Sequence, residues 1–391
     1  MELSKKQTEF LSKIQEGKNI FLTGKAGTGK SFVVKEAIEI LKAQGKNVAA
    51  VAPTGIAANN ISGQTIHSLF GIRPFGILNF DVCNRLKGEK RRLLDAVDVI
   101  FIDEVSMLRC DILDAMNWTL LKNGCKPLKK KQIIFIGDLK QLPVVLKDHE
   151  RAVLFEDYDG DDFTFAKIYK ELEPEVIELD EVLRQSDEDF INNLNVIREG
   201  GKAVYFKQFV SDHATGIILA PHNATVERYN KAGLDSINEP ELVFEAKVEG
   251  NVKASDFQLE TTVRVKQGAK IIYLVNSTDS ILRNGTLGIF ITHNDCNYIR
   301  VDGVDYVLQK VRSTKVEYVL NKFTNKLELQ EIGFIEQIPI KLAYALSIHK
   351  SQGMTFDEVT VDLSLPCFVK GQMYVALSRV KTPAGLKIIT K

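Results

Sequence analysis

Cysteine is scarce in this chain, and its few occurrences lie far apart. The five positions are Cys83, Cys110, Cys125, Cys296 and Cys367. None forms a Cys-x-x-Cys pair or stands at a zinc-ligand spacing from histidine. This scatter argues against a structural zinc site and against a disulfide framework, because both need grouped sulfur ligands. We therefore expect a reducing compartment such as the cytosol.

The chain also lacks an excess of charge of either sign and any long apolar run. Lys+Arg and Asp+Glu both number 51 among the 391 residues, so an anionic partner must be held by local basic patches. No run approaches the roughly 20 apolar residues that span a bilayer. The first residues, Met1 to Lys6, carry no apolar signal segment. We expect no membrane contact, no targeting signal, and a cytoplasmic protein that is prokaryotic, nucleoid-associated or phage-encoded.

The most informative segment runs from Asn19 to Ser31, where an apolar strand leads into Gly-x-x-x-x-Gly-Lys-Ser and a helix-forming stretch. Glycines let the backbone N–H groups converge on phosphate oxygens, and the next helix presents its positive N-terminus to the same charge. Lys30 would reach the β- and γ-phosphates, and the Ser31 hydroxyl would bind magnesium. The residues expected to cradle the nucleotide are Gly24, Ala26, Gly27, Thr28 and Gly29. The pattern predicts ATP or GTP binding.

Short Val- and Ile-rich runs alternate with helical stretches in two series. The first series covers residues 20–22, 48–52, 97–102 and 132–136, and the second covers 176–179, 216–220, 342–345, 358–363 and 386–390. This alternation is typical of parallel sheets with helices on both faces, so the sequence predicts an α/β protein with two tandem units. Closely spaced β-type runs between residues 287 and 339 predict a small all-β insert in the second unit.

Polar residues follow two strands of the first series. Asp103 and Glu104 end the third strand, where Asp103 suits a magnesium shell and Glu104 suits polarising the attacking water. Gln141 follows the fourth strand and could sense a γ-phosphate or order the water. An acidic pair of this kind also favours hydrolysis over a simple binding switch.

With these motifs in order, the chain resembles superfamily 1B DNA helicases of the branch that contains Pif-one, RecD and Dda-like proteins, most of all the Pif-one type. Gln7 matches the adenine-reading glutamine of that family. The segments 52–58 and 65–70 look like motifs Ia and Ib, which touch single-stranded DNA, although both could also be ordinary helix caps. Motif III departs from the family pattern, since Val144 stands where a second proline is usual.

The second unit carries the more discriminating matches. Residues 181–185, 341–355 and 374–379 resemble motifs IV, V and VI. The resemblance implies that Arg184 and Arg379 act as arginine fingers on the γ-phosphate, and that Gly353 couples the nucleotide to the DNA side. It assigns DNA contacts to Thr54, Thr65, His67, Ser347, His349 and Lys350. His349 could instead be a structural histidine.

The resemblance implies two RecA-like P-loop NTPase cores, with domain limits that follow the motifs. The first core would span residues 1–170 and include a short 1B wedge hairpin near 71–92. The second core would span 171–286 and 340–391, with an SH3-like 2B insert at 287–339. The basic run inside 71–92 could equally be a solvated helix face.

We therefore expect an ATP-dependent DNA helicase that uses Mg2+ and moves along single-stranded DNA, by resemblance in the five-prime to three-prime direction. Its partners would be single-stranded DNA, forked or tailed duplex DNA and replication or repair proteins, and the motor would be a monomer. Two other functions share the first core: a motor subunit of a larger recombination or repair complex, and an ATPase switch directed at proteins. The residue patterns do not decide whether the protein moves on DNA or RNA, or whether it favours G-quadruplex structures.

Overall fold

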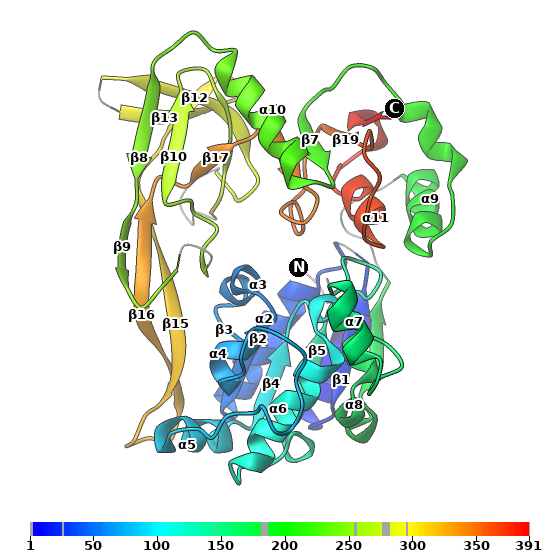
Figure 1. Cartoon of the computed structure of the whole chain (residues 1–391), viewed down its shortest axis with the longest axis vertical. Coiled ribbons are helices and arrows are strands. Elements are labelled where there is room, and N and C mark those ends of the chain that lie inside the picture. Colours follow the sequence, from blue (N-terminus) through cyan, green and yellow to red (C-terminus); the bar gives the residue numbers. More distant parts are fainter. Residues whose placement is uncertain are drawn as a thin grey trace. The chain divides into compact units, whose positions relative to one another are not determined.

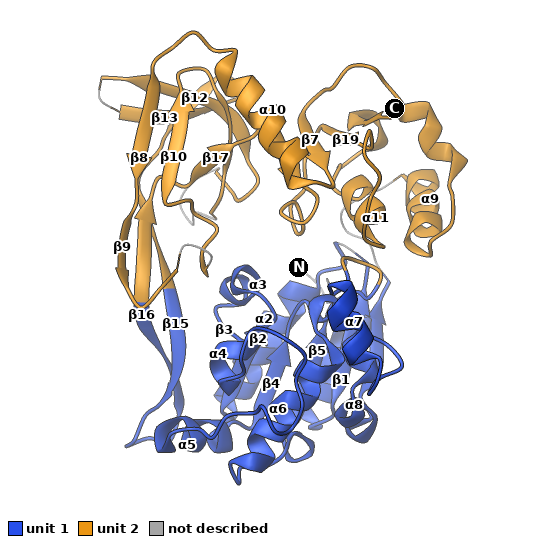
Figure 2. Ribbon diagram, viewed as in Figure 1, with its two compact units in different colours: residues 1–139, 143–184, 315–332 blue, residues 140–142, 185–314, 333–391 orange. Residues whose placement is uncertain are grey.

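The computed structural model describes residues 3–25, 27–144, 146–180, 187–253, 256–275, 282–294 and 296–390. The chain divides into two compact units, each built from separate stretches of sequence (Figure 2). Unit 1 contains Met1–Leu139, Pro143–Arg184 and Lys315–Ile332. Unit 2 contains Lys140–Leu142, Gln185–Thr314 and Gly333–Lys391. No helix in the described ranges has the length and apolar character needed to cross a membrane.

Unit 1 is organised around a parallel sheet of six strands (Figure 1). In spatial order the strands are β3 (Gln64–Thr65), β2 (Val48–Ala52), β4 (Val99–Ile102), β5 (Gln132–Ile136), β1 (Ile20–Gly24) and β6 (Glu175–Leu179). Because all strands run the same way, their carboxyl ends meet at one edge, which is where ligands bind in open α/β sheets. Strand β1 therefore delivers the phosphate-loop sequence to the same edge as the residues after β4 and β5.

Alternate residues of these strands enter two different cores. Ile20, Leu22 and Phe101 pack with helices on one face, whereas Phe21, Ile102 and others pack on the opposite face. This period of two is what a sheet covered on both sides requires. On the first face lie α1 (Lys5–Gln15) and α2 (Lys30–Ala43). The second face is covered by α4 (Ile66–Phe70), α5 (Gly88–Ala96), α6 (Cys110–Lys122), α7 (Asp148–Leu154) and α8 (Lys167–Leu172).

Unit 2 contains a parallel sheet of its own and several antiparallel strands. The parallel order is β18 (Ala345–Ser347), β7 (Ile217–Ala220), β19 (Val359–Asp362) and β20 (Leu386–Ile389). The helices of this unit are α9 (Glu188–Arg198), α10 (Asn223–Asp235) and α11 (Gln372–Leu377). An antiparallel sheet runs in the order β14 (Val304–Val307), β13 (Cys296–Val301), β12 (Leu287–His293), β11 (Lys270–Tyr273) and β17 (Ile340–Leu342). A separate pair is formed by β8 (Glu241–Glu245) and β10 (Thr262–Lys266).

A long hairpin belongs to both units. Strands β15 (Val311–Leu320) and β16 (Leu327–Gln337) form a three-stranded sheet with β9 (Lys247–Gly250), while the hairpin end, Lys315–Ile332, clusters with unit 1. Within unit 1 the Tyr318 hydroxyl accepts a hydrogen bond from Ala50 N at 2.9 Å. Leu327 N donates to Asn47 Oδ1 at 3.0 Å. The hairpin end is therefore a structural part of the first unit.

Removing the Tyr318 hydroxyl should destabilise unit 1. Tyr318→Phe leaves the Ala50 amide of the largely buried strand β2 without this acceptor, and an unpaired buried amide costs about 1–3 kcal/mol. We expect a lower free energy of unfolding in urea denaturation. Phe323→Ala is the matched control, because the Phe323 side chain at the hairpin turn is 99% exposed. Equal stability of Tyr318→Phe and the native chain would contradict this role.

The structure differs from five sequence expectations on domain limits and strands. Residues 176–179 were expected in the second unit, but β6 pairs with β1 along its length and so completes the first sheet. The antiparallel region begins at β8, well before residue 287, and the hairpin end lies in unit 1. The expected strand at 342–345 is split, since Leu342 ends β17 and Ala345 starts β18. Residues 71–87 form turns and irregular chain leading to α5, and not a strand hairpin.

Candidate functional site

The phosphate loop lies between β1 and α2, at the carboxyl edge of the first sheet. Gly29 caps α2 in the left-handed region at φ +80°, a conformation that costs glycine little. Gly24 has φ +146°, and a Cβ there would lie 2.5 Å from the Leu179 carbonyl oxygen of β6. Both positions therefore need glycine for backbone reasons. Ala26 lies outside the described residues.

Side chains of the loop hold its shape from inside. Lys30 Nζ donates to the carbonyl oxygens of Gly24 at 2.7 Å and Lys25 at 3.0 Å. Thr28 is buried and its hydroxyl donates to Lys25 O at 3.0 Å. The Ser31 side chain, in the first turn of α2, is exposed. The ammonium group and the exposed hydroxyl are the two groups that a phosphate and its metal ion would need.

The acidic pair follows β4 directly. Asp103 Oδ1 accepts a hydrogen bond from Glu104 N at 2.9 Å. Burial raises the pKa of Asp103, whereas the Glu104 N–H and the charge of Lys30 act in the opposite direction. The Lys30 ammonium and the Asp103 carboxylate are therefore near enough to interact electrostatically.

Glu104 has an unusual backbone conformation that the sequence did not reveal. Its φ of +51° and ψ of +46° place a non-glycine residue in the left-handed region, which costs of the order of 1 kcal/mol or more. Such conformations gather at functional sites because the surrounding fold must hold them in place. Next to it, Gly137 after β5 packs so closely against Val105 that a Cβ on this glycine would lie 3.0 Å from Val105 N. Strand β5 thus supports the turn that carries Glu104.

Gln7 is buried near the start of α1. Its amide oxygen accepts a hydrogen bond from Ser4 N at 3.0 Å, and its backbone N–H donates to Ser4 Oγ at 3.2 Å. This reciprocal pair is a capping box. The capping box fixes the orientation of the side chain that the resemblance assigns to adenine.

The predicted DNA contacts of unit 1 lie at helix starts after β2 and β3. Thr54 caps α3 (Gly55–Asn60) by accepting from Ala57 N at 3.3 Å, and Thr65 caps α4 by accepting from Ser68 N at 3.2 Å. Both hydroxyls therefore serve as caps, the alternative that the sequence left open. Burial and the nearby charge of Arg109 lower the pKa of His67, and this shift favours the neutral imidazole.

Arg379 of unit 2 is 1% exposed. Its guanidinium donates to Val375 O at 2.9 Å, Met354 O at 3.2 Å and Ser378 Oγ at 2.7 Å. These bonds join the end of motif V to the helix of motif VI. The sequence did not predict this burial, because an arginine near a helix end is usually solvated. Arg184 lies outside the described residues.

The other predicted residues of unit 2 surround the carboxyl ends of its parallel strands. Ser347 is buried at the end of β18, Lys350 is exposed, and Gly353 has φ +81°. His349 Nε2 is buried and has no hydrogen-bond partner among the described residues, and burial lowers the pKa of this side chain. Gln141 Oε1 accepts from Gln352 Nε2 at 3.3 Å, which links the loop of motif III to motif V within this unit.

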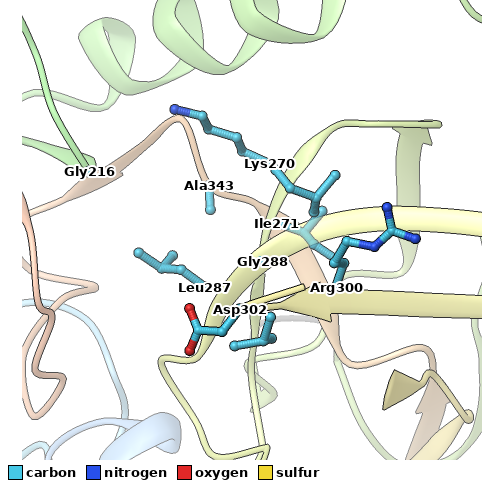
Figure 3. Close-up of a pocket in the computed structure, with 10 residues that line it drawn as sticks. Gly216, Lys270, Ile271, Leu287, Gly288, Arg300, Asp302 and Ala343 are labelled. Carbon is cyan, nitrogen blue, oxygen red and sulfur yellow. The ribbon is translucent and has the colours of Figure 1, made fainter. Parts of the chain in front are cut away.

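A surface pocket of 240 Å³ lies in the antiparallel part of unit 2 (Figure 3). Lys270 of β11, Leu287 of β12 and Arg300 of β13 line it. Arg300 is paired with Asp305 at 2.6 Å. None of the residues predicted for nucleotide or DNA contact lines this pocket, so it carries no part of the predicted chemistry.

The phosphate loop, the partly buried acid after β4 and the parallel sheet together define a P-loop nucleotide-binding protein. Comparison with known proteins narrows this class. Residues 2–208 match the family described as PIF1-like helicase, and the chain belongs to this family.

Relatives match over nearly the whole chain. The ATP-dependent DNA helicase Pif1 of Campylobacter jejuni is 28% identical, covering 97% of this chain and 90% of the relative. The ATP-dependent DNA helicase PIF1 of Danio rerio is 32% identical over 99% of this chain, which spans 61% of that longer protein. Among solved structures, Bacteroides sp. Pif1 in complex with ADP-AlF4 has a TM-score of 0.88 and 33% identity, covering 99% of this chain and 92% of that one. Bacteroides Pif1 bound to ssDNA has a TM-score of 0.68.

Proposed function

We propose that this chain, by family an ATP-dependent DNA helicase, travels along single-stranded DNA from five-prime to three-prime and separates duplex DNA ahead of it. The nucleotide half of this proposal rests on one observation: the phosphate loop places Lys30 near enough to the partly buried Asp103 for their charges to interact. The structures of Bacteroides Pif1 bound to ssDNA and of two coordinating Pif1 helicases at forked dsDNA support the nucleic-acid half. We propose that the protein acts in the cytosol as a monomer. Its substrates would be single-stranded and forked or tailed DNA, and its partners would be replication or repair proteins.

The nucleotide-binding residues fit ATP with magnesium. Lys30 would exchange its bonds to Gly24 O and Lys25 O for phosphate oxygens, while Gln7 would contact the base. Ser31 and Asp103 supply oxygen atoms of the kind that Mg2+ prefers. When bound, the metal ion neutralises charge on the β- and γ-phosphates. Glu104 would accept the proton of the attacking water, and Gln141 would orient that water.

Arginine supplies the remaining positive charge in the proposal. Arg379, together with Arg184, would stabilise the charge that develops on the transferred phosphoryl group. Because the Arg379 guanidinium is bonded to Val375 O and Met354 O, its action requires these bonds to be exchanged during the cycle. In the sequence, Gly353 lies between Met354, which bonds to Arg379, and the DNA-contact residues of motif V. Motif V would therefore connect the nucleotide site to the bound DNA strand.

Contacts to the strand would come from hydroxyl and imidazole groups on both units and from one ammonium group on unit 2. Thr54, Thr65 and His67 lie at helix starts of unit 1, and Ser347, His349 and Lys350 lie at the end of β18 in unit 2. Such groups hold the sugar-phosphate chain without reading its sequence. In domain terms, we propose that units 1 and 2 hold the two RecA-like cores, and that the antiparallel strands of unit 2 correspond to the SH3-like 2B domain.

Polarity is tested with two tailed duplexes. One carries a five-prime single-stranded tail and the other a three-prime tail of equal length and sequence. We expect Mg2+- and ATP-dependent strand separation with the five-prime tail alone. Separation of the three-prime substrate alone would reverse the assigned direction, and separation of neither would contradict the helicase proposal.

Lys30→Ala should abolish ATP hydrolysis and weaken nucleotide binding. The variant removes the ammonium group that we assign to the β- and γ-phosphates, and it also removes the bonds to Gly24 O and Lys25 O that shape the loop. The measurement is steady-state phosphate release together with titration of a fluorescent ATP analogue. Lys35→Ala, on the exposed face of the same helix α2, is the control and should behave as the native chain. Native turnover in Lys30→Ala would remove Lys30 from the site.

A further inference from the structure

Unit 2 carries an exposed aromatic side chain to which the sequence assigned no role. Phe368, in the loop between β19 and α11, is 56% exposed. Its ring lies 5.0 Å from that of His222, at an interplanar angle of 37°. It also stacks at 6.2 Å and 25° on His349. Three flat rings from distant parts of the sequence are thus grouped in one place.

The topology of the parallel sheet explains this grouping. His222 follows the end of β7, His349 follows β18, and Phe368 follows β19. Neighbouring parallel strands of this sheet bring their carboxyl ends to one edge. The same edge holds Ser347 and Lys350, to which we assign contacts with the sugar-phosphate chain. An aromatic surface and phosphate-binding groups therefore share one edge of unit 2.

The loop that carries Phe368 is fixed on both sides of the ring. His222 Nε2 donates to Pro366 O at 3.1 Å. Gln372 Oε1 accepts from Phe368 N at 3.0 Å and from Val369 N at 3.3 Å. Gln372 is fully buried at the start of α11. The backbone that carries the ring is therefore held in place while the ring stays partly in contact with solvent, so binding a flat ligand needs little further ordering of this loop.

Other exposed phenylalanines lack this setting. Phe323 is 99% exposed at a hairpin turn, and the structure gives it no aromatic neighbour among the described residues. A single exposed apolar side chain needs no explanation. An exposed aromatic ring next to two histidines, on a fixed backbone, is different, because it presents the kind of surface on which nucleobases stack.

We propose that Phe368, supported by His222 and His349, is a stacking platform for a base of the bound single strand. This inference rests on the proposed function and adds to it a base contact beside the phosphate contacts. Every base has a stacking face, so the platform is compatible with travel along any sequence. Gln372 joins the platform to α11, which ends next to Arg379. Stacking of a base on Phe368 would therefore be connected, through Gln372 and α11, to the segment that carries the proposed arginine finger.

The platform predicts that binding depends on bases at this position. We would measure the affinity for a labelled oligothymidylate and for an abasic oligonucleotide of equal length, at one fixed salt concentration because phosphate contacts are salt-sensitive. Phe368→Ala should weaken binding of oligothymidylate about 5- to 100-fold and leave binding of the abasic strand as it is in the native protein. Phe323→Ala is the matched control and should alter neither affinity.

A second variant reports on stacking directly. The chain has one tryptophan, Trp118 of unit 1, so Trp118→Phe combined with Phe368→Trp places the single indole at the platform. Saturating oligothymidylate should quench its fluorescence, and saturating abasic strand should not. Two results would overturn the platform proposal. One is equal fluorescence quenching by oligothymidylate and by the abasic strand. The other is a Phe368→Ala variant whose affinity changes equally, or not at all, for the two strands. If the native protein binds neither strand, the proposed function itself fails.

Discussion

Arg379→Ala is expected to lower the rate of DNA-stimulated ATP hydrolysis by about 10³- to 10⁵-fold, the range known for arginine fingers. The planar guanidinium can donate two parallel hydrogen bonds to phosphoryl oxygens, which a lysine ammonium cannot reproduce. Arg379→Lys should therefore remain strongly impaired although it keeps the charge. Single-turnover hydrolysis at saturating ATP and single-stranded DNA is the measurement.

The buried position of Arg379 makes a stability control necessary. Its guanidinium holds Met354 O, Val375 O and Ser378 Oγ, so Arg379→Ala also removes packing and hydrogen bonds. Urea denaturation and the affinity for single-stranded DNA show whether unit 2 is still folded. Arg264→Ala is the matched control, since Arg264 is an exposed partner of Glu241 on a strand of the same unit. A folded Arg379→Ala variant with less than a tenfold loss of turnover would show that this arginine is structural.

Glu104→Gln should bind ATP and fail to hydrolyse it. The amide keeps the size of the carboxylate but cannot accept a proton from water, and general-base catalysis contributes about 10²- to 10⁴-fold. We expect a loss of turnover in that range with nucleotide affinity close to native. Binding is measured by titration of a fluorescent ATP analogue, and turnover by phosphate release in the presence of single-stranded DNA.

Glu173→Gln controls for the unusual backbone of Glu104. Glu173 is an exposed glutamate that also has a left-handed conformation, with φ +43° at the end of α8. The same substitution there should leave turnover unchanged. Native turnover in Glu104→Gln would remove Glu104 from the general-base role, whereas similar losses in both variants would indicate a backbone effect.

The phosphate loop and four strands of the first sheet, β1, β2, β4 and β5, could be predicted from the sequence because their signals are local. The glycines, Lys30 and the apolar strand before them stand within a dozen consecutive residues, and β2 and β5 occupy the predicted ranges 48–52 and 132–136. Family membership was predicted in the same way, and the match of residues 2–208 to PIF1-like helicases confirms it. Motif residues stay adjacent in the chain however the chain folds.

The domain limits depend on distant pairings that no local pattern contains. Strand β6 reads like the start of a new α/β unit, yet its partner is β1, some 150 residues earlier in the chain. The β15–β16 hairpin alternates like any exposed strand pair, and nothing in residues 315–332 indicates that Tyr318 meets Ala50. For the same reason the burial of Arg379 and the meeting of Phe368 with two histidines could not be read from the sequence. These features arise from tertiary packing.

The central claim is that nucleotide hydrolysis by this chain serves movement on a nucleic-acid strand. The most direct test is steady-state ATP hydrolysis without nucleic acid and then with single-stranded DNA, duplex DNA or single-stranded RNA, at one fixed salt concentration. We expect strong stimulation by single-stranded DNA and much less by the blunt duplex, and the RNA arm identifies the preferred strand. Hydrolysis that is indifferent to all three would contradict the motor and favour an ATPase switch directed at proteins.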